Sequence, residues 1–117
     1  MSTFTNGRQG EERAAQFLES QGLRVIGRNY RSKRGEIDLV ALDRDTIVFV
    51  EVKAWSAFAF EDLEKSITIQ KQRRIIETAK FFLSEHREYN RMAVRFDVIF
   101  VGPEEVQHLA EAFMERV

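Results

Sequence analysis

The chain has 117 residues, of which 44% are hydrophobic and 32% charged, and this composition fits one globular domain spanning residues 1–117. The absence of cysteine excludes disulfides and thiolate metal sites. There is no apolar run long enough for a signal peptide or a membrane span, so we expect a cytoplasmic protein without a membrane partner. The net charge of −1 argues against a protein that coats nucleic acid without specificity.

The apolar pattern predicts helices and strands in alternation along the chain. A helix is expected over residues 7–21, a strand over 23–30, two strands at 35–42 and 46–54, a helix over 67–86 and a strand over 92–101. The tail at 104–113 is compatible with a strand or a helix. The order helix, three strands, helix, strand predicts an α/β structure with a helix on each side of a sheet.

The two strands at 35–42 and 46–54 form a predicted hairpin around the polar turn "DRDT". A turn centred in this tetrapeptide places Asp38 opposite Glu51, and Glu36 opposite Lys53. Opposed residues share a face of the sheet, so the four polar side chains are expected at one end of one face. The Asp38 and Glu51 Cβ atoms would be roughly 4.5–5.5 Å apart, and opposed like charges destabilise a strand pair.

Two interpretations account for this polar corner. Lys53 alone could supply the positive charge, which would make the corner a buried ion cluster that affects only stability. Buried ion pairs stabilise poorly, however, and carboxylate oxygens are preferred ligands of Mg²⁺ and Mn²⁺. Two carboxylates that hold a metal beside a lysine suit phosphodiester hydrolysis, in which the lysine positions or deprotonates water and stabilises developing negative charge.

Several motifs resemble one known family. "GEIDLV" followed by "VFVEVK", with "GRQGEERAAQFL" upstream and "RFDVIF" downstream, is similar to the YraN-like family of small bacterial proteins. The resemblance implies a restriction-endonuclease-like (PD-(D/E)xK) core, with a mixed sheet flanked by helices, similar in outline to Holliday-junction resolvases. It implies that Asp38 and Glu51 hold the metal, that Lys53 is the catalytic lysine, and that Glu11 adds a ligand from the first helix. Glu36 belongs to the family's "GEID" string and is expected to support the site.

This chain departs from the family pattern after the motif lysine. Trp55 stands where an arginine is expected, and "FAF" stands where a Phe-Gly pair is expected. An arginine could contact a phosphate, whereas Trp55 could only stack on a base or pack. The stretch "AWSAFAF" could be a partner surface or part of the core.

Basic residues gather in places that could contact DNA. Residues 22–35 contain five basic residues and no acidic one, and of these Arg31, Lys33 and Arg34 are expected to bind phosphates. A solvated loop is the alternative for that segment. Lys71 interrupts the apolar stripe of its helix, so it either extends to solvent or reaches a phosphate, with Gln70 beside it.

Other polar residues are expected to be structural or exposed. Arg95 and Asp97 face the same way on their strand and predict a structural pair. His86 and His108 make no metal-binding spacing and are expected at the surface.

Two functions of different classes follow from these residues. The first is a nuclease that uses Mg²⁺ or Mn²⁺ to hydrolyse DNA, including branched or structured forms, and forms a homodimer in order to cut two strands. The second is a nucleic-acid or protein-binding module that keeps the nuclease fold without cleavage activity. The acidic pair and Lys53 favour the first, whereas Trp55 and the near-neutral charge favour the second.

Overall fold

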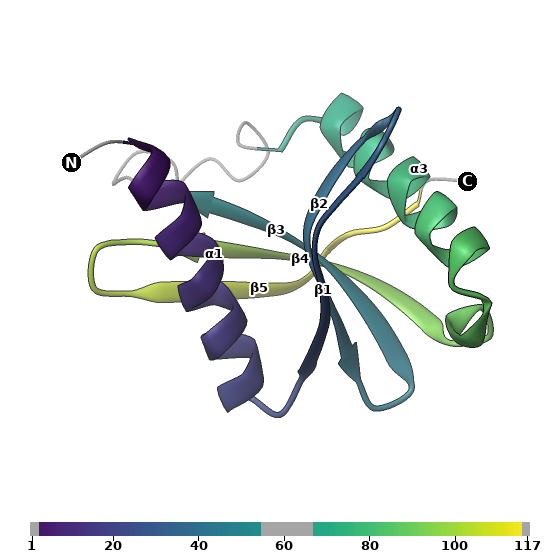
Figure 1. The fold of residues 1–117 in the computed structure, drawn as a ribbon, viewed down its shortest axis with the longest axis horizontal. Coiled ribbons are helices and arrows are strands. Elements are labelled where there is room, and N and C mark those ends of the chain that lie inside the picture. Colours follow the sequence, from purple (N-terminus) through teal and green to yellow (C-terminus); the bar gives the residue numbers. More distant parts are fainter. Residues whose placement is uncertain (1–2, 55–66, 116–117) are drawn as a thin grey trace.

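The computed structural model describes residues 3–54 and 67–115, arranged around one five-stranded sheet (Figure 1). The sheet has the strand order β1-β2-β3-β4-β5. Strands β3 and β4 are parallel and the other neighbouring pairs are antiparallel, so the sheet is mixed and the α/β class is confirmed. In chain order, the elements are α1 (Thr3–Ser20), β1 (Arg24–Ser32), β2 (Gly35–Asp43), β3 (Thr46–Ala54), α3 (Ile69–Glu85), the short 3-10 helix η1 (Arg87–Tyr89), β4 (Ala93–Val101) and β5 (Val106–Phe113).

The helices α1 and α3 pack against residues of opposite parity on β3 and β4. Because successive side chains of a strand point to opposite faces, the two helices cover the two faces, as predicted. The α1 cluster is formed by Ala14, Ala15, Leu18, Leu23, Leu39, Ala41, Val48, Val50, Ile99 and Val101. The α3 cluster is formed by Ile37, Val40, Ile47, Phe49, Ile75, Ile76, Ala79, Phe82 and Phe96.

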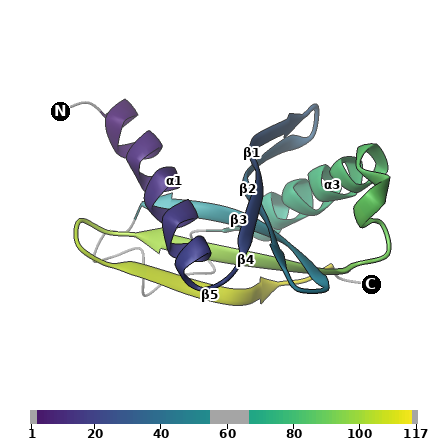
Figure 2. The same ribbon diagram turned by 60° about the horizontal axis from the view of Figure 1, so that its bottom comes forward.

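The predicted hairpin register is correct for only one part of β2. The β2–β3 ladder runs from Leu39 paired with Val50 to Asp43 paired with Thr46, which agrees with a turn in "DRDT". β2 pairs with β1 along its whole length, and closer to the start of β2 both strands bend out of the plane of β3–β5 toward α3 (Figure 2).

This bend overturns the predicted pairing at the polar end of the hairpin. Glu36 pairs with Arg31 of β1 rather than standing opposite Lys53 in the β2–β3 ladder. The Asp38 side chain bonds the neighbouring strand directly, because its Oδ2 accepts the backbone N–H of Val52 at 2.7 Å. The predicted opposition of Glu36 and Lys53 is therefore wrong. The ladder also stops before Asp38 and Glu51, but their side chains remain neighbours, and a side-chain contact holds β2 to β3 where β2 leaves the sheet.

The C-terminal tail is a strand, and one of the two histidines is part of a buried polar network. Asp97 of β4 is fully buried, and its carboxylate accepts hydrogen bonds from Arg95 Nε at 2.9 Å and from the backbone N–H of Glu111 at 3.0 Å. The Nε2 of His108 lies 2.7 Å from the same carboxylate. Burial alone would raise the pKa of Asp97, but the contacts with His108 and Arg95 hold that pKa below its ordinary value. The predicted Arg95–Asp97 pair is confirmed.

The expectation that both histidines lie at the surface is wrong. His108 is half-buried against Asp97, and His86 is half-buried with its ring stacked on Phe82 at a centroid distance of 4.0 Å. The predicted features at Trp55 and most of "AWSAFAF" lie outside the described residues. A membrane span would need a longer or more apolar helix than any in the described parts of the chain.

Candidate functional site

Four elements bring the predicted site residues together where β2 leaves the sheet. Glu51 and Lys53 lie near the end of β3, Asp38 lies on the bending part of β2, and Lys71 lies in the first turn of α3. The α1 helix, which carries Glu11, passes the end of β3 (Figure 1). Segments far apart in the sequence therefore contribute charged groups to one place.

Glu51 is the most enclosed charged group of this site. Its residue is only 6% exposed, although it carries a carboxylate. The Lys71 Nζ lies 2.6 Å from Glu51 Oε2, and the Lys53 Nζ lies 3.7 Å from the same oxygen. A buried carboxylate requires a positive partner, and here the closer partner is the helix lysine rather than the motif lysine.

Asp38 is held in a setting that opposes its negative charge. Burial, followed by the charge of the neighbouring Glu51 carboxylate, raises the pKa of Asp38 to about 8. The hydrogen bond from the Val52 amide acts in the opposite direction but does not compensate. Glu11 also acts on the pKa of Asp38 in the raising direction, which shows that the α1 carboxylate contributes to the negative potential at this position.

The two lysines of the site influence each other in opposite directions. Burial, together with the nearby Lys71 ammonium, lowers the pKa of Lys53 below its ordinary value, against the pull of the two carboxylates. Burial alone would lower the pKa of Lys71 as well, but its hydrogen bonds to Glu51 and Lys53 raise that pKa above its ordinary value. Lys53 therefore gives up its proton more easily than Lys71 does.

The donor set suits a hard divalent cation that keeps several water ligands. Asp38 and Glu51 present carboxylate oxygens, and their mutual repulsion leaves a negative potential that a cation would relieve. Among the described residues, no three acidic or histidine side chains are grouped closely enough to bind a metal on their own. The assignment of Glu11 as a third ligand stays a prediction, and a cation here would take its remaining ligands from water or the backbone.

The predicted phosphate-binding residues lie on a neighbouring part of the surface. Lys33 and Arg34 form the two-residue turn between β1 and β2. The start of β2 packs closely on α3, since a Cβ placed on Gly35 would lie 3.3 Å from Thr78 Oγ1. Arg34 reaches Glu77 of α3 at 3.6 Å, and Arg31 reaches Glu36 at 3.5 Å. These weak, exposed pairs leave the guanidinium groups available to another anion.

Gln70 is exposed at the start of α3, next to Lys71. The helix begins there because the Thr68 side chain accepts the backbone N–H of Lys71 at 3.1 Å. This cap fixes the position of the Lys71 backbone, so its side chain extends from a rigid helix end. The sequence identified Lys71 as a break in an apolar stripe, but it gave no signal that its partner would be Glu51.

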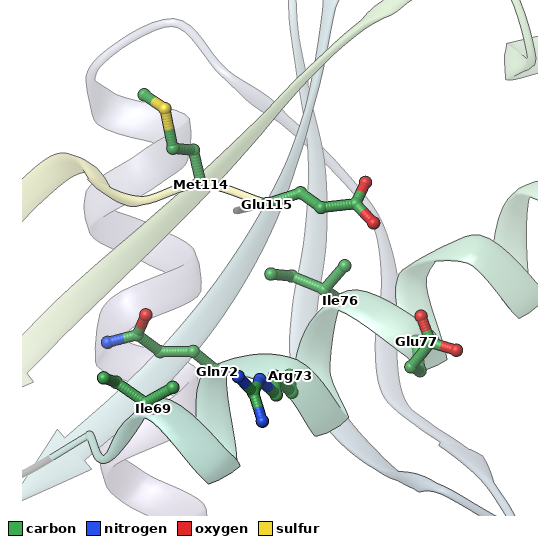
Figure 3. Close-up of a pocket in the computed structure, with 7 residues that line it drawn as sticks. All are labelled: Ile69, Gln72, Arg73, Ile76, Glu77, Met114 and Glu115. Atoms are coloured by element: carbon green, nitrogen blue, oxygen red, sulfur yellow. The ribbon is translucent and has the colours of Figure 1, made fainter. Parts of the chain in front are cut away.

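A separate hollow lies on another side of α3. It has a volume of about 250 Å³ between the helix and the residues that follow β5 (Figure 3). None of the charged residues of the carboxylate site is among the described residues that line it. The lining is formed by Ile69, Gln72, Arg73, Ile76, Glu77, Met114 and Glu115.

Comparison with known proteins gives matches along nearly the whole chain. The sequence profile of "Uncharacterised protein family UPF0102" matches residues 10–101, a range that includes every residue of the carboxylate site. A "UPF0102 protein" of Treponema pallidum (strain Nichols) is 44% identical, with 95% of this chain and 94% of the relative covered. Relatives of the same name in Lachnoclostridium phytofermentans and Persephonella marina are 42% and 39% identical, and the alignments cover 97% of this chain and 96% and 97% of the relatives. The family resemblance read from the sequence motifs is confirmed.

Proposed function

The chain belongs to the UPF0102 family, and for this member of it we propose the function of a metal-dependent nuclease that hydrolyses DNA phosphodiesters. The observation that carries the proposal is the buried Glu51 carboxylate beside Asp38, with two lysines within reach. Burying such charged groups costs folding free energy, so their presence indicates a role in chemistry rather than in stability. The helix and strand order and the mixed sheet also support a restriction-endonuclease-like core.

Asp38 and Glu51, with Glu11 nearby, are the residues that would hold Mg²⁺ or Mn²⁺. When bound, such an ion would polarise the phosphoryl group and lower the pKa of a coordinated water. Lys53 takes the role of the base or water-positioning group, because its lowered pKa makes a neutral amine easier to reach near neutral pH. The Glu51 carboxylate, whose Oε2 lies 3.7 Å from the Lys53 Nζ, holds this lysine at the site.

The basic residues Arg31, Lys33 and Arg34 supply a rim that binds the DNA backbone, with Gln70 as a further polar contact. Their exposed side chains can exchange their weak glutamate partners for phosphates. Glu36 supports this rim through its contact with Arg31. Since one site cleaves one phosphodiester, cutting both strands of a duplex calls for a homodimer.

The test is calorimetric titration of Mn²⁺ and Mg²⁺ into the wild type, Asp38→Asn and Glu51→Gln, with and without duplex DNA. Glu12→Gln is the matched control, because Glu12 is an exposed carboxylate of α1 paired with Arg28. We expect saturable binding in the wild type and the control, and loss of binding in both site variants. The same four proteins are then assayed on branched, nicked and single-stranded DNA, where cleavage should follow metal binding.

A second function has one specific observation in its favour. Lys71 Nζ lies 2.6 Å from Glu51 Oε2, an ion pair that is also expected for a binding module in which the corner is only an ion cluster. In that case the wild type would bind no cation even with DNA present, and the neutralised variants would keep their DNA affinity. That result would replace the nuclease proposal with a nucleic-acid-binding module.

A further inference from the structure

Under the proposed nuclease function, a divalent cation competes with Lys71 for the Glu51 carboxylate. The lysine ammonium lies at hydrogen-bonding distance, 2.6 Å, from Glu51 Oε2. That oxygen belongs to the carboxylate that the proposed function assigns to a divalent cation. A lysine ammonium and a metal ion cannot both take the same oxygen at bonding distance without strong repulsion.

Resting on the proposed function, we propose that Lys71 is an internal counter-ion that occupies Glu51 in the metal-free protein, competes with the divalent cation for it, and moves to a DNA phosphate once the carboxylate is taken. The residue would thus act as a positioning residue for substrate, linked to the state of the metal site. Lys53, in contrast, stays with the carboxylates.

The structure distinguishes the two lysines in their freedom to move. The Lys71 side chain is 41% exposed, whereas that of Lys53 is 27% exposed. Lys71 also extends from the first turn of a capped helix, so its backbone is fixed while its four-carbon stem can swing. Arg34 of the basic turn reaches Glu77, and Gly35 lies against Arg74 and Thr78, so this turn packs one to two helical turns from Lys71 on the same helix.

The test compares wild type with Lys71→Met, which keeps the length and apolar stem of the side chain but removes its charge. Lys80→Met is the control, because Lys80 lies on the same helix and pairs with Glu77 and Glu115 instead. Titration of Mn²⁺ alone into each protein gives the metal affinity. Fluorescence anisotropy with a labelled DNA four-way junction in Ca²⁺, which takes the same oxygen ligands, gives the DNA affinity.

Competition predicts opposite changes in the two affinities. Lys71→Met should bind Mn²⁺ about three- to tenfold more tightly than wild type, equivalent to about 0.7–1.4 kcal/mol, and it should bind the junction about threefold or more weakly. Lys80→Met should stay close to wild type in both. Equal or weaker Mn²⁺ binding by Lys71→Met would overturn the competition and leave the nuclease proposal intact. Absence of Mn²⁺ binding in wild type and variant alike, with and without DNA, would overturn the metal site itself.

Discussion

Neutralising Asp38 should make the metal-free protein more stable in alkaline solution. The pKa of Asp38 is raised from 3.8 to about 8, so the folded protein retains this proton over a pH range in which the unfolded chain has lost it. The contribution of Asp38 to the free energy of unfolding is therefore fully present below the unfolded-state pKa near 4 and is lost as the pH rises through 8. Asp38→Asn keeps an oxygen for the Val52 amide and removes the titration.

The size of the effect follows from the shift. A change from 3.8 to about 8 corresponds to about 6 kcal/mol at 1.36 kcal/mol per pH unit. This figure is an upper bound, because water and the two lysines rearrange around the ionised carboxylate. We expect Asp38→Asn to gain about 1–4 kcal/mol at pH 9, the range seen when a buried ion pair is replaced by apolar residues, and to gain less at pH 5, where only a smaller part of the stability loss has developed.

The assay is urea unfolding of wild type and Asp38→Asn at both pH values with EDTA present, and Glu12→Gln is the surface control. The midpoints should differ more at pH 9 than at pH 5, with unchanged denaturant slopes. Added Mn²⁺ should then stabilise wild type but not the variant, since a ligand that binds only the folded state raises its stability. An equal difference at both pH values, or a loss of stability at pH 9, would refute the account of Asp38.

Three further predictions concern separate parts of the molecule. Lys53→Met should lower the DNA cleavage rate by about 10²–10⁴-fold, as expected for loss of a general base, while calorimetry shows Mn²⁺ affinity within a few-fold of wild type. Asp97→Asn should cost about 1–3 kcal/mol in urea unfolding at pH 7, because it removes the buried carboxylate that binds Arg95 and His108, while Asp43 still pairs with Arg95 at 3.0 Å. The pKa of Asp97 is lowered, so its stabilisation is present above pH 3.8 and the deficit of the variant should shrink on acidification below that value. Combined Lys33→Ala and Arg34→Ala should weaken DNA binding and reduce the slope of log affinity against log salt by about 2, measured by anisotropy; an unchanged slope would remove this turn from the proposed interface.

The sequence predicted those parts of the fold that depend on local patterns. Alternating apolar residues identify β2, β3 and β4, and the turn between Asp43 and Thr46 sets the register of the ladder as far as Leu39. Beyond Leu39 the path of β2 depends on contacts with β1 and α3, which a local pattern does not describe. A register extrapolated from a turn cannot include such a bend, and for this reason the predicted opposition of Glu36 and Lys53 is wrong.

The sequence does not distinguish a strand from a helix at 104–113, because its few apolar residues fit both the strand and the helix periodicity. Its pairing with β4 decides the matter, and the Asp97 carboxylate takes part through its contact with the Glu111 amide. His108 then points to the same buried carboxylate. His108 and Val106 are two residues apart and therefore share a face of β5. This spacing is informative only once the segment is known to be a strand.

The sequence predicts which residues form the candidate site, but it does not predict which of them contact each other. Asp38, Glu51 and Lys53 follow from a motif, whereas Lys71 is separated from Glu51 by a segment whose length says nothing about where α3 begins relative to β3. Thr68, which caps the helix, places Lys71 in its first turn. A contact between two elements depends on how they pack, and helix periodicity reports only which face of one element is apolar.

The charges of this site indicate which ligands would balance them. Two carboxyl groups and two lysines face each other, and the raised pKa of Asp38 shows that the lysines do not satisfy both carboxyl groups in their ionised form. Both lysines act on Glu51, and burial together with their mutual repulsion lowers the pKa of Lys53. A divalent cation would satisfy the carboxylates but leave two lysines in excess, and a phosphate alone would satisfy the lysines but repel the carboxylates. A cation and a phosphodiester together satisfy both sets of groups, so we expect each to increase the affinity of the protein for the other.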